Sequence, residues 1–113
     1  GQAGSFTTVT GRLPYATSKS ALIGFTAQLA KDEAESGVTV NAVLPGLILG
    51  AQGTRIRSRF DELPEERRAQ TLEAMPMKRA GTPDEVAAVV AFLMSDAASY
   101  VSGAAIPIDG AFL

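Results

Sequence analysis

The sequence predicts an α/β protein built around an open, doubly wound parallel sheet. Three observations carry this prediction. Residues 14–36 show helical spacing, residues 38–44 form a short β-branched run that ends at a Pro-Gly pair, and a helix start at residues 82–85 precedes a second apolar run at residues 104–108. A strand, a crossover helix and a second strand form a βαβ unit of a parallel sheet. The predicted order is therefore long helix, strand, loop, helix, strand, which is the trailing part of such a sheet.

The first half of the chain predicts a loop, a helix and a buried strand. Residues 1–12 are rich in glycine, serine and threonine, as loops are. The helix over residues 14–36 ends in charged residues before Gly37, a residue type that commonly follows a helix. The strand over residues 38–44 is largely apolar, so we expect it to be buried.

The segment over residues 45–80 carries proline, glycine and charge with weak periodicity, and it predicts a loop that contains a polar helix at residues 64–75. Its basic cluster lies beside two carboxylates, and we interpret the cluster as part of a solvated loop. The cluster consists of Arg55, Arg57 and Arg59.

The next helix has a clear beginning, because a threonine cap is followed by a proline at the first helical position and by two carboxylates. These residues are Thr82, Pro83, Asp84 and Glu85. The apolar residues of this helix continue to about Met94, and the second strand follows.

Length and composition exclude several classes of protein. With 113 residues the chain holds one domain at most, and we treat residues 1–113 as a single, partial domain. The net charge of −2 gives no basic surface for nucleic acid. Cysteine and histidine are absent, which excludes disulfides, thiolate or histidine metal sites and histidine-dependent triads. We expect no metal, no membrane span, no signal peptide and a cytoplasmic location.

Tyr15 and Lys19 are the most informative residues of the chain. Four residues apart on a helix, they share one face, one turn from each other. A nearby ammonium favours the phenolate and lowers the pKa of a tyrosine, and Pro14 suits the first turn, near the positive end of the helix dipole. Tyr15 is therefore a candidate general acid or base.

Five blocks in fixed order make the whole chain similar to the C-terminal half of a short-chain dehydrogenase/reductase, a family with a Rossmann-type sheet. The first block is the Tyr-x-x-x-Lys pair. The others are the strand with Asn41 that leads to Pro45 and Gly46, the helix start at residues 82–85, the run at residues 92–96, and the end at residues 103–110.

The resemblance implies an oxidoreductase that interconverts an alcohol and a ketone with NAD or NADP. In that interpretation Tyr15 transfers the substrate proton, and Lys19 assists it and binds the ribose of the cofactor. Pro45 and Gly46 lie against the nicotinamide, and the backbone of Ile48 contacts its carboxamide. Asn41 is interpreted as structural, through hydrogen bonds that hold a loop.

The chain departs from the family pattern in several places. The family's catalytic serine is expected near Gly1 or Gln2, which carry no hydroxyl, and Ser5 is the nearest serine. Gly50 occupies the position expected for a threonine, with Thr54 close by in sequence. In place of the family's closing Asp-Gly-Gly, this chain has Asp109, Gly110 and Ala111. We expect the acid to serve the terminal turn or a subunit contact.

The glycine-rich phosphate loop of dinucleotide-binding folds, with the acid that follows it, is missing from the sequence. We therefore expect the chain to be a fragment whose N-terminal half is missing. Such a fragment exposes an open strand edge and apolar helix faces, which favour pairing with another chain. We expect a homo-oligomer.

Two other functions stay open at this point. The chain could be a non-catalytic, self-associating remnant of the family. Less favoured is a cofactor-independent hydrolase that uses Tyr15 with Lys19, or a serine beside the lysine, since a Ser–Lys arrangement works without histidine. The flanking serines are Ser18 and Ser20.

Overall fold

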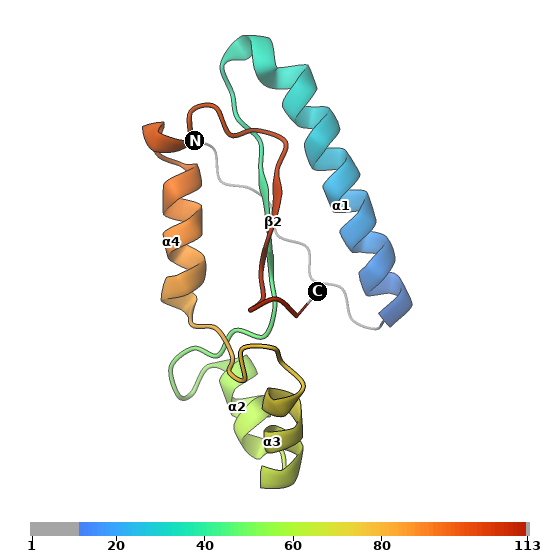
Figure 1. The fold of residues 1–113 in the computed structure, drawn as a ribbon, viewed down its shortest axis with the longest axis vertical. Coiled ribbons are helices and arrows are strands. Elements are labelled where there is room, and N and C mark those ends of the chain that lie inside the picture. The colour runs from blue at the N-terminus through green and yellow to red at the C-terminus, as the bar shows by residue number, and fades with distance from the viewer. Residues whose placement is uncertain (1–11, 113) are drawn as a thin grey trace. The chain divides into compact units, whose positions relative to one another are not determined.

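The computed structural model of the protein describes the backbone of residues 12–112 and the side chains of residues 16–112. Its helices and strands follow in the predicted α/β order (Figure 1): α1 (Arg12–Glu33), β1 (Ala42–Pro45), α2 (Arg55–Glu62), α3 (Glu65–Glu73), α4 (Pro83–Leu93) and β2 (Ala105–Ile108). Short 3-10 turns follow α1 at Ala34–Ser36 and α4 at Asp96–Ala98. The predicted fold class, the trailing part of a Rossmann-type sheet, is confirmed.

The described residues fall into two compact units. The first unit contains residues 12–42 and 92–106, and the second contains residues 43–91 and 107–112. The first therefore holds α1 and the 3-10 turn that follows α4. The second holds α2, α3, most of α4 and the loop after β1. That residues 1–113 form one partial domain stays a prediction.

Helix α1 continues without interruption to Glu33, and a 3-10 turn carries the chain on to Gly37. Gly37 has φ 75° and donates its N–H to the carbonyl oxygen of Ala34 at 3.1 Å, so it ends the 3-10 turn. The helical segment stops at the predicted residue, but its last three residues are 3-10 and not α-helical. The interior side of α1 carries Thr26 and Ala30, both buried. A Cβ on Gly103 would lie 3.4 Å from the Cβ of Ala30, so small residues let this loop approach the helix.

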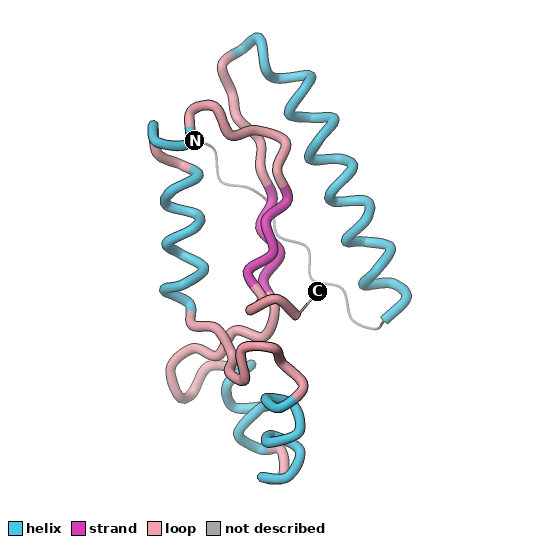
Figure 2. The backbone as a smooth tube through the Cα atoms, viewed as in Figure 1, coloured by secondary structure: helices cyan, strands magenta, loops and turns pink. Residues whose placement is uncertain are grey.

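Strands β1 and β2 pair side by side, as Figure 2 shows. In the first unit, the N–H of Gly103 donates to the carbonyl oxygen of Val40 at 2.7 Å, and that of Ala42 to Ala104 at 2.8 Å. In the second unit, the N–H of Gly46 donates to the carbonyl oxygen of Ile108 at 3.0 Å. The numbers of the bonded residues rise along both strands, so the strands run parallel, as the βαβ interpretation requires.

The strand predicted over residues 38–44 is wrong at its beginning, since β1 starts only at Ala42. Before that point the pairing is mixed: the N–H of Val40 donates to the Oγ of Ser102 at 3.1 Å, while its carbonyl oxygen accepts from the N–H of Gly103. The predicted burial is also only partly right, because Ala42 and Leu44 are buried whereas Val38 is 47% exposed. Strand β2 likewise begins one residue later than predicted.

Asn41 has the structural role that the sequence predicted. Its Nδ2 donates to the carbonyl oxygen of Val101 at 3.1 Å, and its Oδ1 accepts from the N–H of Ala104 at 3.1 Å. One amide side chain thus joins the residues before β1 to those before β2 through both its donor and its acceptor.

The segment over residues 45–80 is more helical than predicted. The basic cluster lies on α2 and not in a loop. Arg57 and Asp61 form an i,i+4 ion pair at 3.2 Å along one face of this helix, which adds to its stability. Helix α3 lies inside the predicted range of residues 64–75. The loop predicted over residues 1–12 lies outside the described residues except for Arg12, which is helical. Among residues 12–112, no helix combines the length and apolar character needed to cross a membrane.

Candidate functional site

Tyr15 and Lys19 both lie within α1, so the helical segment on which their pairing depends is present. Residues four apart on a helix are one turn apart on the same face, and this places the two side-chain attachment points together. Lys19 is half-buried. The side chain of Tyr15 lies outside the described residues, and the acid–base role of the pair stays a prediction.

The serines beside Lys19 lie on other faces of the helix. Ser18 and Ser20 are sequence neighbours of Lys19, and consecutive residues of a helix diverge by about 100° around its axis. This geometry gives no support to a Ser–Lys nucleophile. Ser5, the nearest candidate for the family's serine, lies outside the described residues.

The Pro-Gly pair lies at the carboxyl end of β1, where open α/β sheets bind their ligands. Pro45 is the last residue of the strand, and Gly46 continues the pairing to Ile108. A Cβ on Gly46 would lie 2.8 Å from the Cβ and 3.0 Å from the Cα of Asp109. The backbone of the loop therefore approaches the C-terminal turn more closely than any side chain would allow.

Ile48 pairs with Gly81 through an isolated parallel bridge. The N–H of Gly81 donates to the carbonyl oxygen of Leu47 at 2.9 Å, and the N–H of Leu49 donates to that of Gly81 at 3.0 Å. In such a bridge the hydrogen bonds to Gly81 are made by the residues before and after Ile48, and not by Ile48 itself. The N–H and C=O of Ile48 itself therefore point away from Gly81. The predicted carboxamide contact needs backbone groups that face outward in this way.

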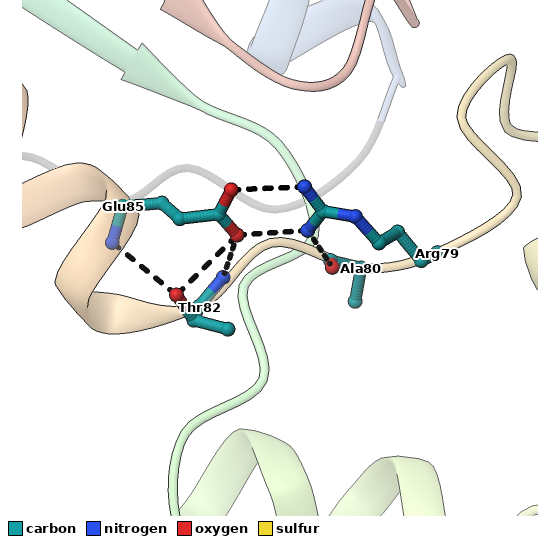
Figure 3. A network of polar contacts seen from close by, with 4 residues as sticks. All are labelled: Arg79, Ala80, Thr82 and Glu85. Atoms are coloured by element: carbon teal, nitrogen blue, oxygen red, sulfur yellow. Dashed lines mark hydrogen bonds and ion pairs between the residues drawn. The ribbon is translucent and has the colours of Figure 1, made fainter.

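The beginning of α4 carries a polar network in which the predicted threonine cap is confirmed and the link to Arg79 was not predicted (Figure 3). The Nη1 and Nη2 atoms of Arg79 donate to the two carboxylate oxygens of Glu85 at 2.8 and 2.9 Å. Glu85 also accepts from the N–H of Thr82 at 3.0 Å, while the Thr82 hydroxyl accepts from the N–H of Glu85 at 3.2 Å. This reciprocal arrangement is a capping box, and the Thr-x-x-Glu spacing was the signal available to find it.

The network should be visible in an acid titration. Hydrogen bonding to Arg79, followed by the hydrogen bond from the Thr82 backbone, lowers the pKa of the Glu85 carboxyl to about 2. Because the folded-state pKa is depressed, the stability from this carboxylate is complete above the ordinary glutamate pKa and is lost as the pH falls toward 2. An NMR titration of the Glu85 carboxyl carbon measures the midpoint directly. Arg79→Gln should raise it, and an ordinary midpoint in the unchanged chain would contradict the pair.

The end of the chain forms the predicted terminal turn. The Oδ1 of Asp109 accepts from the N–H of Ala111 at 3.1 Å, and Gly110 and Ala111 have φ of 60° and 67°. The Oδ2 of Asp109 is buried and has no hydrogen-bond partner among the described residues. The predicted alternative, a subunit contact, stays a prediction.

Thr54 lies close to the position where the family pattern expects a threonine. Its hydroxyl is 3.5 Å from the point where a Cβ on Gly50 would stand, and it donates to the carbonyl oxygen of Ala51 at 2.9 Å. Tyr15 and Lys19 belong to the first unit, while Pro45, Gly46 and Ile48 belong to the second. Within the part of the chain that the structure describes, no three acidic residues gather as metal ligands would.

Comparison with known proteins identifies the family. A family model described as enoyl-(acyl carrier protein) reductase matches residues 2–112. Protein FixR of Bradyrhizobium diazoefficiens is 49% identical over 96 residues, which are 85% of this chain and 31% of that protein. The 3-oxoacyl-[acyl-carrier-protein] reductases FabG of Pseudomonas aeruginosa and Aquifex aeolicus are each 44% identical, over 88% and 93% of this chain and 38% and 40% of their own lengths.

The chain belongs to the short-chain dehydrogenase/reductase family, and the resemblance inferred from its five sequence blocks is confirmed. It spans between 31% and 40% of the lengths of these relatives. The part of the family fold that it represents contains the Tyr-x-x-x-Lys helix and the Pro-Gly loop.

Proposed function

We propose that this chain is the acid–base segment of an NAD(P)-dependent oxidoreductase that interconverts an alcohol and a ketone. It would act together with a cofactor-binding segment that supplies the phosphate loop missing from its sequence. The observation that carries the proposal is the uninterrupted helix through Tyr15 and Lys19, since residues four apart on a helix share one face. The names of the FabG relatives support the ketone, since a 3-oxoacyl group contains one.

In this proposal Tyr15 donates its phenolic proton to the carbonyl oxygen during reduction and accepts a proton from the alcohol during oxidation. The ammonium of Lys19 stabilises the phenolate that forms and binds the ribose hydroxyls by hydrogen bonds. The nicotinamide, when bound, supplies or accepts the hydride. The substrate oxygen and the Tyr15 hydroxyl must then lie within hydrogen-bond distance of each other.

The loop after β1 fits a nicotinamide. It lies at the carboxyl end of a parallel strand, and Pro45 and Gly46 are both exposed there. The outward-facing N–H and C=O of Ile48 match the donor and acceptor of a carboxamide. Pro45 and Gly46 would form the wall against the ring.

Complementation tests the proposal. The chain is mixed with the part of P. aeruginosa FabG that it does not cover, a ketone and the reduced cofactor, and the absorbance of the reduced nicotinamide is followed. Turnover that requires both polypeptides supports the proposal. If the two polypeptides associate but show no turnover of ketones or alcohols, the proposal is contradicted.

We also infer that the chain self-associates through α1. Leu22, Phe25 and Leu29 are spaced to share one face of the helix, and Leu22 and Phe25 are 41% and 64% exposed. An apolar helix face in water favours pairing with a second copy of the same face, as in a two-fold dimer.

A charge on that face should dissociate the oligomer. We expect Phe25→Glu to shift the sedimentation coefficient toward that of a monomer, because it places a carboxylate in the apolar contact. Ser20→Glu is the matched control, since Ser20 is exposed on a different side of α1 and should leave the oligomer intact. An unchanged chain that sediments as a monomer at all concentrations would refute the inference. A stable multimer without any calorimetric response to NAD or NADP favours the non-catalytic alternative.

A further inference from the structure

Gly81 holds the loop after β1 by two backbone hydrogen bonds. Its N–H and its carbonyl oxygen both bond to the loop, at Leu47 and Leu49, on either side of Ile48. A Cβ on Gly81 would lie 2.8 Å from the Cδ1 of Ile48, so the side chain of Ile48 lies directly over this glycine. The position of the Ile48 peptide groups thus depends on where Gly81 lies.

Gly81 is in turn held from both sides by one carboxylate. Arg79, two residues before it, and Thr82, one residue after it, both donate to Glu85 in the first turn of α4 (Figure 3). The Nη1 of Arg79 also donates to the carbonyl oxygen of Ala80 at 3.1 Å, which braces the peptide before Gly81. A two-point guanidinium–carboxylate contact fixes direction as well as distance.

The ion pair is solvent-exposed, with side-chain exposed fractions of 54% for Arg79 and 44% for Glu85. Exposed pairs add little to the global stability of a protein. The Arg79–Glu85 pair links residues on both sides of Gly81, which forms the bridge to Ile48. Its stabilising effect therefore falls mainly on the loop after β1. A local role in holding the loop explains the two-point contact between Arg79 and Glu85 better than a contribution to global stability does.

We propose that Arg79 and Glu85 are positioning residues for the nicotinamide side of the cofactor site, acting through Gly81 on the backbone of Ile48. The inference rests on the proposed function for its cofactor, while the coupling between the ion pair and the loop does not. Neither residue touches the substrate or the cofactor. Each keeps the outward-facing groups of Ile48 in place.

Amide hydrogen exchange on the 113-residue chain tests the coupling directly. We expect Arg79→Gln to speed exchange at the N–H groups of Leu49 and Gly81 by about two- to fivefold, because the bridge opens more often. The N–H of Gly46, which bonds to Ile108 in the same unit, is the internal reference and should not change. Arg79→Lys keeps the charge but not the two-point contact of the guanidinium, and it should give an intermediate increase in the exchange rate.

Lys78→Gln is the matched control. Lys78 is adjacent to Arg79 and also forms an exposed ion pair, at 3.1 Å, but with the more exposed Glu73 of α3 rather than with α4. It should leave exchange at Leu49 and Gly81 unchanged. Equal acceleration by Lys78→Gln and Arg79→Gln, or no acceleration by Arg79→Gln, would overturn the positioning role.

The complemented enzyme gives the second measurement. Arg79→Gln should raise KM for the nicotinamide cofactor by about two- to fivefold, with a smaller change in kcat, whereas Lys78→Gln should change neither. Faster exchange with an unchanged cofactor KM would overturn the link to the cofactor. If the unchanged chain shows no turnover, the proposed function fails and the cofactor role falls with it. Unchanged exchange refutes the positioning role alone, so the two failures are distinguishable.

Discussion

Replacing Tyr15 with phenylalanine should lower turnover in the complemented enzyme by roughly 10²–10⁴-fold, the usual contribution of a positioned general acid or base. Phenylalanine keeps the ring and the helix and removes only the hydroxyl that transfers the proton. We expect the change mainly in kcat, because the proton moves in the reaction step and not in binding. Initial rates from the absorbance of the reduced nicotinamide, in both directions, measure it.

Two further variants on the same helix make the test specific. Lys19→Met should also lower turnover, and it should weaken cofactor binding as well, because Lys19 has two proposed partners. Ser20→Ala should leave turnover intact, since Ser20 is exposed and lies off the Tyr15–Lys19 face. Full activity of Tyr15→Phe, with the hydroxyl gone, would remove the basis for the acid–base assignment.

Features that depend on near neighbours in sequence were predictable. The stop at Gly37, after the 3-10 turn that follows α1, and the start of α4 at Pro83 follow from single residues whose backbone preferences are strong. The helical spacing of Tyr15 and Lys19 and the position of the Pro-Gly loop after a strand are equally local. They define the candidate site before any tertiary contact is known.

Features that depend on contacts between distant residues were not predictable. Helix α2, which carries the basic cluster, was missed for a different and local reason: its apolar periodicity is weak, although the Arg57–Asp61 spacing supports a helix. The bridge between Ile48 and Gly81 joins segments separated by two helices, and no local pattern records it. The start of β1 was misplaced because a side chain, Ser102, bonds where a strand partner was expected.

A methyl group at position 46 should disrupt the loop that the proposed function requires. Gly46→Ala would place a Cβ 2.8 Å from the Cβ and 3.0 Å from the Cα of Asp109, and the second of these is backbone that cannot rotate away. Overpacking of this kind costs about 1–3 kcal/mol in free energy of unfolding. We expect a lower denaturant midpoint for the chain, measured by circular dichroism.

Gly24→Ala should stabilise the same chain, in contrast to Gly46→Ala. Nothing lies within 4 Å of the position of a Cβ on Gly24, which is inside α1, so alanine should raise stability by about 1 kcal/mol through helix propensity. Gly46→Ala should also weaken the cofactor interaction in the complemented enzyme, because the clash can be relieved only by moving Pro45 or the turn at Asp109. If Gly46→Ala is as stable as the unchanged chain, the close approach of these two backbones is refuted.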